Sequence, residues 1–155
     1  MNAAINTAAN TPSTQSAGFS AAANKQIMQE VMAELADGNG KPFVDRMADD
    51  FRWTIPGSTP WSRTYEGKQA VVSELLQPLF AQFATPYIST TRRVMADGDM
   101  VVIECQGQVT TKAGMAYNNS YCYVCRMDGG KMKELMEYFD TELVSTALEA
   151  PAVAA

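Results

Sequence analysis

Histidine is absent from the sequence of 155 residues. This absence excludes Ser-His-Asp triads, Cys-His catalytic pairs and histidine-ligated metal sites. Any acid–base chemistry must therefore come from Asp, Glu, Tyr, Lys or Cys side chains. The chain also lacks a glycine-rich phosphate loop and a G-x-S-x-G segment. We therefore expect no cofactor and no bound metal.

Cysteine is scarce, with three residues, an odd number too small for a secreted disulfide framework. Cys122 and Cys125 have C-x-x-C spacing, but the run Tyr121-Cys122-Tyr123-Val124-Cys125 is typical of a strand. A separation of three in a strand places two side chains on opposite faces. We therefore expect small buried or half-buried residues here, and no redox pair or zinc site.

Positive charge and long apolar runs are also in short supply. Twelve Lys and Arg residues against 17 Asp and Glu give a net charge of −5, which argues against nucleic acid and an anionic membrane as partners. No stretch approaches the roughly 18 apolar residues of a membrane span. Residues 1–24 carry no charge and have neither the basic start nor the apolar centre of a secretory signal. We expect a cytoplasmic protein.

Apolar residues are abundant enough, at 46%, to form the core of one domain. The uncharged residues 1–24, rich in Ala, Asn, Thr and Ser, predict a flexible head. Residues 149–155 predict a similar tail. The folded domain is therefore expected over residues 25–148.

Apolar residues recur with a helical spacing mainly in the first half of the chain and with a strand spacing mainly in the second half. Spacings of three and four predict helices over 25–37, from Pro42 to near Asp49, and over 68–83, where Pro78 should kink the helix. Alternation predicts a short strand at 51–55 and four longer strands at 86–96, 99–111, 115–127 and 131–140. Asp-Gly turns at 97–99 and 128–130 join two pairs of them. A last short helix is expected at 141–148.

Three helices followed by a run of strands joined by tight turns predict an α+β fold. Long strands with short turns form an antiparallel, strongly curved sheet, which would wrap around the three N-terminal helices as a cone. One opening of this cone would be an apolar pocket for a small apolar molecule. The outer face of the sheet would be free to form a homodimer.

Four segments, in order, resemble the nuclear transport factor 2-like superfamily, in its branch of ketosteroid isomerases and SnoaL-like polyketide cyclases. They are residues 47–53, 56–71, 118–121 and 130–140. The resemblance as a whole covers about residues 25–148. The resemblance implies a cone-shaped, cystatin-like α+β barrel. It says less about chemistry, because this fold also carries hydrolases, dehydratases and proteins without catalytic activity.

The catalytic groups of ketosteroid isomerases are replaced in this sequence. By resemblance, the base would be an Asp before a Pro, but Ile55 stands there, before Pro56. The oxyanion-hole Tyr aligns with Val31, and the protonated Asp of that hole falls near Cys122. The isomerase mechanism needs a base and two strong donors. Steroid isomerisation of that kind is therefore not expected.

Limonene epoxide hydrolases, which share the fold, use an Asp-Arg-Asp arrangement. Their Arg-x-Asp pair would fall near Cys105 and Gly107, so that mechanism is not expected either. Their other Asp resembles Asp140, which follows Tyr138 and Phe139. The cyclases are said to use one buried Asp as base, and Asp140 is the candidate that this resemblance implies.

Asp140 and Tyr138 share one face of the strand 131–140 with Met136. If this face points into the cone, desolvation would raise the pKa of the carboxyl and make Asp140 a usable base. Tyr138 could donate to a developing enolate oxygen. Two alternatives remain open for Asp140: a hydrogen bond to a ligand, or the N-cap of the helix that follows.

The predicted ligand-binding residues are mainly aromatic: Trp53, Ile55, Trp61, Tyr65, Phe80, Asn119, Tyr121 and Met136. Core packing is an alternative for Trp53, and a structural role in the sheet is an alternative for Asn119 and Tyr121. Two functions are therefore predicted. One is a cofactor-independent isomerase- or cyclase-like enzyme that transfers a proton on an apolar carbonyl or polyketide-like compound. The alternative is a non-catalytic module for hydrophobic-ligand binding or dimerisation.

Overall fold

The computed structural model describes residues 19–151. The N-terminal half contains α1 (Ala21–Ala36), α2 (Lys41–Asp45), β1 (Met47–Thr54), β2 (Thr64–Glu66), α3 (Lys68–Ala70), the π-helical segment η1 (Val71–Leu76) and α4 (Gln77–Phe80). The C-terminal half contains β3 (Ile88–Asp97), β4 (Met100–Gln108), β5 (Ser120–Asp128), β6 (Lys131–Phe139) and α5 (Thr141–Ala147). Because α3, η1 and α4 form one helical stretch, the expected α+β class with three N-terminal helical regions is confirmed.

The six strands form one sheet in the order β2-β1-β6-β5-β4-β3. The expected hairpin-linked run of β3 to β6 is confirmed, and its pairs are antiparallel. The expectation of a wholly antiparallel sheet is wrong, because β1 runs parallel to β6. Alternation identifies β1 as a strand but says nothing about its direction, which depends on the helical crossover between β2 and β3. The sheet is also not closed into a barrel, since β2 and β3 form its two edges.

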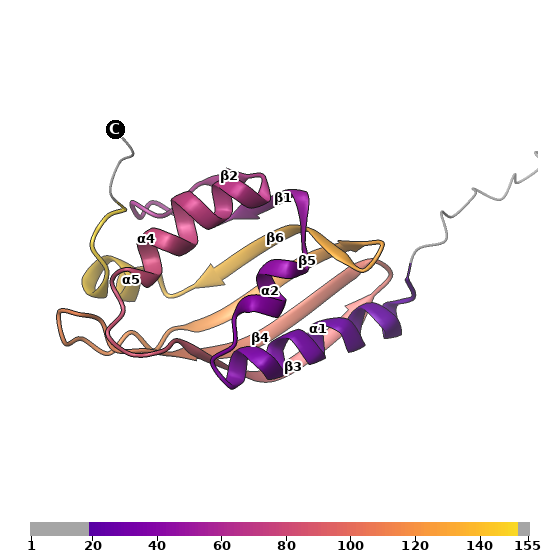
Figure 1. Ribbon diagram of the computed structural model, residues 1–155, viewed down its shortest axis with the longest axis horizontal. Helices are drawn as coiled ribbons and strands as arrows, with labels where there is room; N and C mark the ends of the chain where they lie inside the picture. Colours follow the sequence, from indigo (N-terminus) through magenta and orange to yellow (C-terminus); the bar gives the residue numbers. More distant parts are fainter. Residues whose placement is uncertain (1–18, 152–155) are drawn as a thin grey trace, which may run out of the picture.

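Helix α1 lies along β3 and β4 (Figure 1). It buries Met28, Val31, Met32 and Leu35, as the spacing predicts. The helix begins four residues before the expected position because Ser20 caps it: the Oγ of Ser20 accepts a hydrogen bond from the Ala23 N–H at 3.2 Å. The predicted head at residues 1–24 thus overlaps α1, and its residues 1–18 lie outside the described residues.

The third helical region contains the irregularity that Pro78 predicts. Proline has no N–H, and its ring crowds the carbonyl four residues earlier. The segment before it, η1, is π-helical, and the Gln77 N–H donates to the Val72 carbonyl five residues earlier. None of the helices within residues 19–151 is long and apolar enough to cross a membrane.

Strand alternation separates the two faces of the sheet. On β5, Tyr121, Tyr123 and Cys125 are buried against the helices, whereas Cys122 lies half-buried on the outer face. The predicted separation of Cys122 and Cys125 is therefore confirmed. On β4, Val101, Ile103 and Cys105 occupy the inner face. The core thus lies between the inner face of the sheet and the helices.

Candidate functional site

An aromatic cavity of about 80 Å³ lies between the inner face of the sheet, η1, α4 and α5. Half of its 18 lining residues are aromatic, namely Phe43, Trp53, Trp61, Phe83, Tyr87, Tyr117, Tyr121, Tyr123 and Phe139. Most of the others are aliphatic, from α1, η1, α4 and α5. Among residues 19–151, Glu137 is the one carboxylic acid that lines the cavity. The site is therefore apolar with one titratable group of functional interest.

Glu137 points inward from β6 and is only 7% exposed. Its Oε2 accepts a hydrogen bond of 2.8 Å from the indole Nε1–H of Trp53 on β1. Within residues 19–151, no other side chain or backbone group bonds to this carboxyl. Because burial penalises the charged form, the pKa of Glu137 is raised to about 8, although the indole hydrogen bond lowers it slightly. The group is poised between acid and base close to neutral pH.

Four tyrosines surround the same space. The Tyr121 hydroxyl donates to the Tyr117 hydroxyl at 3.3 Å. Burial raises the pKa of Tyr117 to about 12 and holds those of Tyr87, Tyr121 and Tyr123 well above their usual value. These hydroxyls are therefore neutral near pH 7 and can donate hydrogen bonds.

Gly107 on β4 permits this dense aromatic packing. A Cβ at this position would lie 2.7 Å from the Tyr87 hydroxyl oxygen and 2.8 Å from Cε2 of Tyr121. Real Cβ atoms do not approach other atoms so closely. The glycine is therefore required for the approach of both tyrosines to β4, at the polar side of the cavity.

The C-terminal segment contributes to the lining of the cavity. Trp61 Nε1–H donates to the Glu149 carbonyl at 3.1 Å. The side-chain amide of Gln82 bonds to both the carbonyl and the N–H of Glu149, at 3.0 and 2.9 Å. The adjacent Leu148 lines the cavity together with Val144 of α5.

Four of the predicted ligand-binding residues line the cavity: Trp53, Ile55, Trp61 and Tyr121. The other predicted aromatic residues lie elsewhere. Tyr65 is buried beside the site and donates from its hydroxyl to the Trp61 carbonyl at 3.0 Å. Phe80 is 47% exposed and lies outside the lining. The structure therefore brings together part of the predicted set.

Asn119 has a structural partner. Its side-chain amide both donates to the Asp140 carbonyl and accepts from the Asp140 N–H, each at 3.0 Å. The same Nδ2 lies 3.5 Å from the Tyr117 hydroxyl. Asn119 is therefore buried behind the lining residue Tyr117 and does not line the cavity itself. Its hydrogen bonds connect the end of β6 to the start of β5.

The condition for the chemistry predicted at Asp140, that the Met136 face of β6 points into the cone, is not met in the structure. Met136 and Tyr138 lie on the outer face, and Tyr138 is 50% exposed. Asp140 is exposed and caps α5: its Oδ1 accepts from the N–H groups of Glu142 and Leu143 at 3.0 and 3.2 Å. The capping alternative thus describes its contacts, and its role as a base stays a prediction.

Sequence reasoning missed Glu137 because glutamate is rarely buried without a partner. Alternation shows which residues of β6 share a face, but it does not show which face is buried. The face with Tyr138 and Asp140 carried the predicted donor and base. The opposite face combines Glu137 with the apolar Leu135 and Phe139. That apolar pair was the signal that could have identified the inner face.

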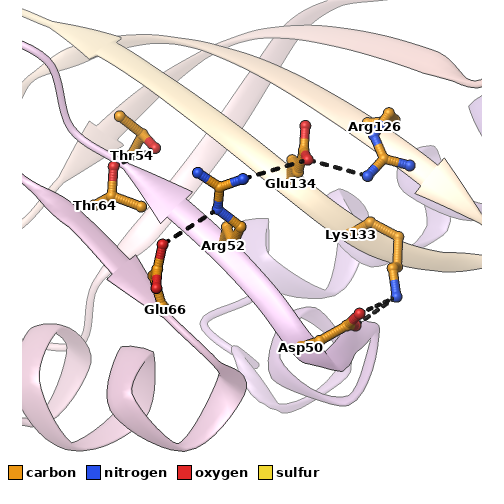
Figure 2. Close-up of polar contacts among 8 residues, drawn as sticks. All are labelled: Asp50, Arg52, Thr54, Thr64, Glu66, Arg126, Lys133 and Glu134. Atoms are coloured by element: carbon orange, nitrogen blue, oxygen red, sulfur yellow. Dashed lines mark hydrogen bonds and ion pairs between the residues drawn. The ribbon is translucent and has the colours of Figure 1, made fainter.

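A row of charged side chains from β2, β1, β6 and β5 lies together on the sheet (Figure 2). Arg126 bonds to Glu134 at 3.1 Å, and Arg52 lies between Glu134 and Glu66 at 3.9 and 3.7 Å. Next to this row, an apolar stripe crosses β3, β4, β5 and β6 through the aligned residues Met95, Val102, Val124 and Met136. Arg93 and Glu104 pair at 3.5 Å on its other side.

Solved structures share this arrangement. An NTF2-like (nuclear transport factor 2-like) protein of unknown function from Burkholderia pseudomallei is 20% identical, with a TM-score of 0.69 over 81% of this chain and 98% of that one. A proposed SnoaL-like polyketide cyclase from Jannaschia is 17% identical, with a TM-score of 0.66 over 83% and 92%. An epoxide hydrolase from M. tuberculosis, of the limonene epoxide hydrolase-like type, is also 17% identical, with a TM-score of 0.60 over 77% and 84%.

These identities show a common, cone-shaped fold and nothing more specific. No curated protein matches the sequence. The SnoaL-like domain, in contrast, matches residues 28–135, which is more than half of the chain and runs from within α1 to within β6. The protein therefore belongs to the SnoaL-like domain family, and it shares its fold with nuclear transport factor 2-like proteins.

Proposed function

We propose that this protein binds a small apolar carbonyl compound in the aromatic cavity and transfers a proton on it, with Glu137 as the acid–base group. The observation that supports this proposal is the Glu137 carboxyl itself. It is buried among aromatic rings, bonded only to Trp53 within the described chain, and has a pKa of about 8. General acids and bases work best when their pKa lies near the operating pH.

The hydrogen bond to Trp53 determines which oxygen is free. The indole N–H is only a donor, so Oε2 of Glu137 acts as an acceptor toward it. In the neutral carboxyl the proton therefore belongs on Oε1. There it can be donated to a carbonyl oxygen, or, after ionisation, Oε1 can abstract a proton from the carbon next to the carbonyl.

The tyrosines supply the second requirement of this chemistry. An enolate oxygen that forms in an apolar site needs preorganised donors. The hydroxyls of Tyr117 and Tyr121 are neutral at pH 7 and already bonded to one another. Either can turn toward a ligand oxygen. A SnoaL-like polyketide cyclase among the structural neighbours is compatible with proton transfer on such compounds.

Heavy-water exchange tests this proposal without a known substrate. Small cyclic ketones such as cyclopentanone would be incubated with the protein in heavy water, and loss of the α-protons would be followed by proton NMR. We expect wild type to accelerate exchange and Glu137→Gln to lower the catalysed rate by at least about 100-fold, the usual effect of a positioned base. Glu134→Gln makes the same change on the outer face of the same strand and should retain the rate.

Asp140→Asn completes the test, because it keeps the cap and removes the base predicted from the sequence. Exchange that survives Glu137→Gln but disappears in Asp140→Asn would assign the base to Asp140 and overturn the role of Glu137. Binding of cyclopentanone without any catalysed exchange would favour the alternative function, a non-catalytic hydrophobic-ligand-binding module. The cytoplasmic location stays a prediction.

We also propose that two copies associate through the outer face of the sheet. The stripe of Met95, Val102, Val124 and Met136 is apolar, and Tyr138 beside it is half exposed. Charges of both signs flank the stripe on each side. A second copy related by a two-fold axis would bury the stripe of each copy against that of the other.

A further inference from the structure

The cavity combines a buried acid with aromatic rings and no basic side chain. Lysine and arginine are both missing from its lining, so among residues 19–151 the carboxyl of Glu137 has no positive partner there. Buried carboxyls in proteins are normally paired with a cation or kept neutral by a proton. The positive partner of Glu137 is therefore either the proton or part of a ligand.

The aromatic rings nearest to Glu137 favour a cationic ligand group. Trp53 bonds to its carboxyl, and Tyr123 is its register partner on β5. Phe43 packs against both rings, with centroid distances of 5.8 Å to Trp53 and 6.2 Å to Tyr123. Aromatic faces attract organic cations through the ring quadrupole, and Trp and Tyr are the strongest of them.

We propose that the cavity binds small organic ammonium ions, with Glu137 as the counter-ion and Trp53, Tyr123 and Phe43 as the aromatic surround. The proposal rests on the proposed ligand cavity but not on catalysis in it. A volume of about 80 Å³ holds roughly five water-sized groups, which suits a trimethylammonium head better than a large ring system. An anionic ligand would find no cation in the lining and would face the carboxylate.

Ionisation of Glu137 controls this binding. The titratable groups that face it from the neighbouring elements are Cys105 on β4, Tyr121 and Tyr123 on β5, and Tyr87, Tyr117 and Tyr65 from the connecting segments and β2. Their pKa values are all raised by burial, to about 11 for Cys105 and to about 12 for Tyr117. Between pH 6.5 and 8.5, Glu137 is thus the group of this set that changes charge.

A matched pair of ligands isolates the charge. Choline and 3,3-dimethyl-1-butanol have nearly the same shape, but only choline is a cation. Isothermal titration calorimetry of the full chain would measure both ligands at pH 6.5 and 8.5. We expect choline to bind at least about tenfold more tightly than the alcohol, and its affinity to rise at least about tenfold over this pH range as the carboxyl ionises.

Two variants assign the effect to the cavity. Glu137→Gln should remove the preference for choline and its pH dependence while the alcohol still binds. Glu134→Gln, on the outer face of β6, should leave both ligands unchanged. The comparison within wild type decides the proposal even if Glu137→Gln does not fold.

Equal or weaker binding of choline than of the alcohol would overturn the cation proposal and leave the proposed apolar pocket intact. A choline preference that persists in folded Glu137→Gln would also overturn it. Failure of both ligands to bind would overturn the cation proposal and count against the ligand pocket itself. Failure of ketone exchange, by contrast, concerns catalysis and leaves the choline result unaffected.

Discussion

At the scale of single residues, the most informative position is Glu137. Glutamate is rarely buried without a partner, yet the structure places Glu137 in the core. Burial makes the ionised form of Glu137 unfavourable, because the loss of hydration is only partly offset by the hydrogen bond from Trp53. This unfavourable desolvation raises the pKa of the carboxyl into a range suited to proton transfer.

This pKa predicts how stability depends on pH. The carboxyl titrates near 4.5 in the unfolded chain and near 8 in the folded protein. Between these values the folded state holds a proton that the unfolded state has lost, so the free energy of unfolding falls as the pH rises. Over the whole titration the free energy of unfolding falls by on the order of 5 kcal/mol. This full loss is reached only above pH 8. Urea unfolding of wild type and Glu137→Gln at several pH values from 5 to 8.5 measures it.

The variant supplies the comparison, because a glutamine does not titrate. Wild type should lose stability relative to Glu137→Gln as the pH rises from 5 to 8.5. Glu134→Gln should follow the wild-type curve closely, since Arg126 and Arg52 hold the pKa of Glu134 below its usual value. Parallel curves for wild type and Glu137→Gln would contradict the raised pKa of Glu137.

At the scale of elements, the junction of β6 and α5 shows how one residue type can fit two roles. An Asp after a strand suits a catalytic base and equally suits a helix N-cap. The structure gives Asp140 the contacts of a cap, and Asn119 fixes its backbone. The start of this helix depends on the packing of its buried residues Val144 and Ala147 against the core.

Substitutions at Asp140 measure this local role. Asp140→Ala should lower the free energy of unfolding by about 1 kcal/mol, because the N–H groups of Glu142 and Leu143 lose their acceptor. The free energy of unfolding of Asp140→Asn should lie within about a few tenths of a kcal/mol of the wild-type value, since asparagine caps a helix as well as aspartate. Urea denaturation at pH 7 gives both values. Equal stability of Asp140→Ala and wild type would show that the cap contributes little.

At the scale of the whole molecule, the sheet has two faces with different tasks. The inner face lines the cavity together with the helices, and Figure 1 shows α1 running along β3 and β4. The outer face carries the ion pairs of Figure 2 and the adjoining apolar stripe. Exposed ion pairs contribute little stability. We therefore assign the stabilising role in the proposed association to the stripe.

The oligomeric state tests that assignment. Wild type should sediment as a dimer in analytical ultracentrifugation. Val124→Glu, in the middle of the stripe, should give a monomer because a dimer would bury two new carboxylates. Ala81→Glu introduces the same charge at the exposed end of α4 and should remain dimeric. A wild-type monomer at every concentration would contradict the proposed interface.

The sequence by itself determined the α+β class, the order of most elements and the family. These follow from local signals: the helical spacing in α1, the Asp-Gly turns, and the alternation in β3 to β6. It also excluded histidine chemistry and placed Cys122 and Cys125 on opposite faces. Such features depend on neighbours along the chain, whose influence can be recognised from residue type and spacing.

Tertiary structure alone decided the direction of β1 beside β6, the inner face of β6 and the composition of the cavity. Trp53 and Glu137 are 84 residues apart in the chain, yet their hydrogen bond defines the site. A strand pattern of period two is satisfied by either face until the sheet is packed. The choice was made by the burial of Leu135 and Phe139 against the helices, which carried Glu137 into the core with them.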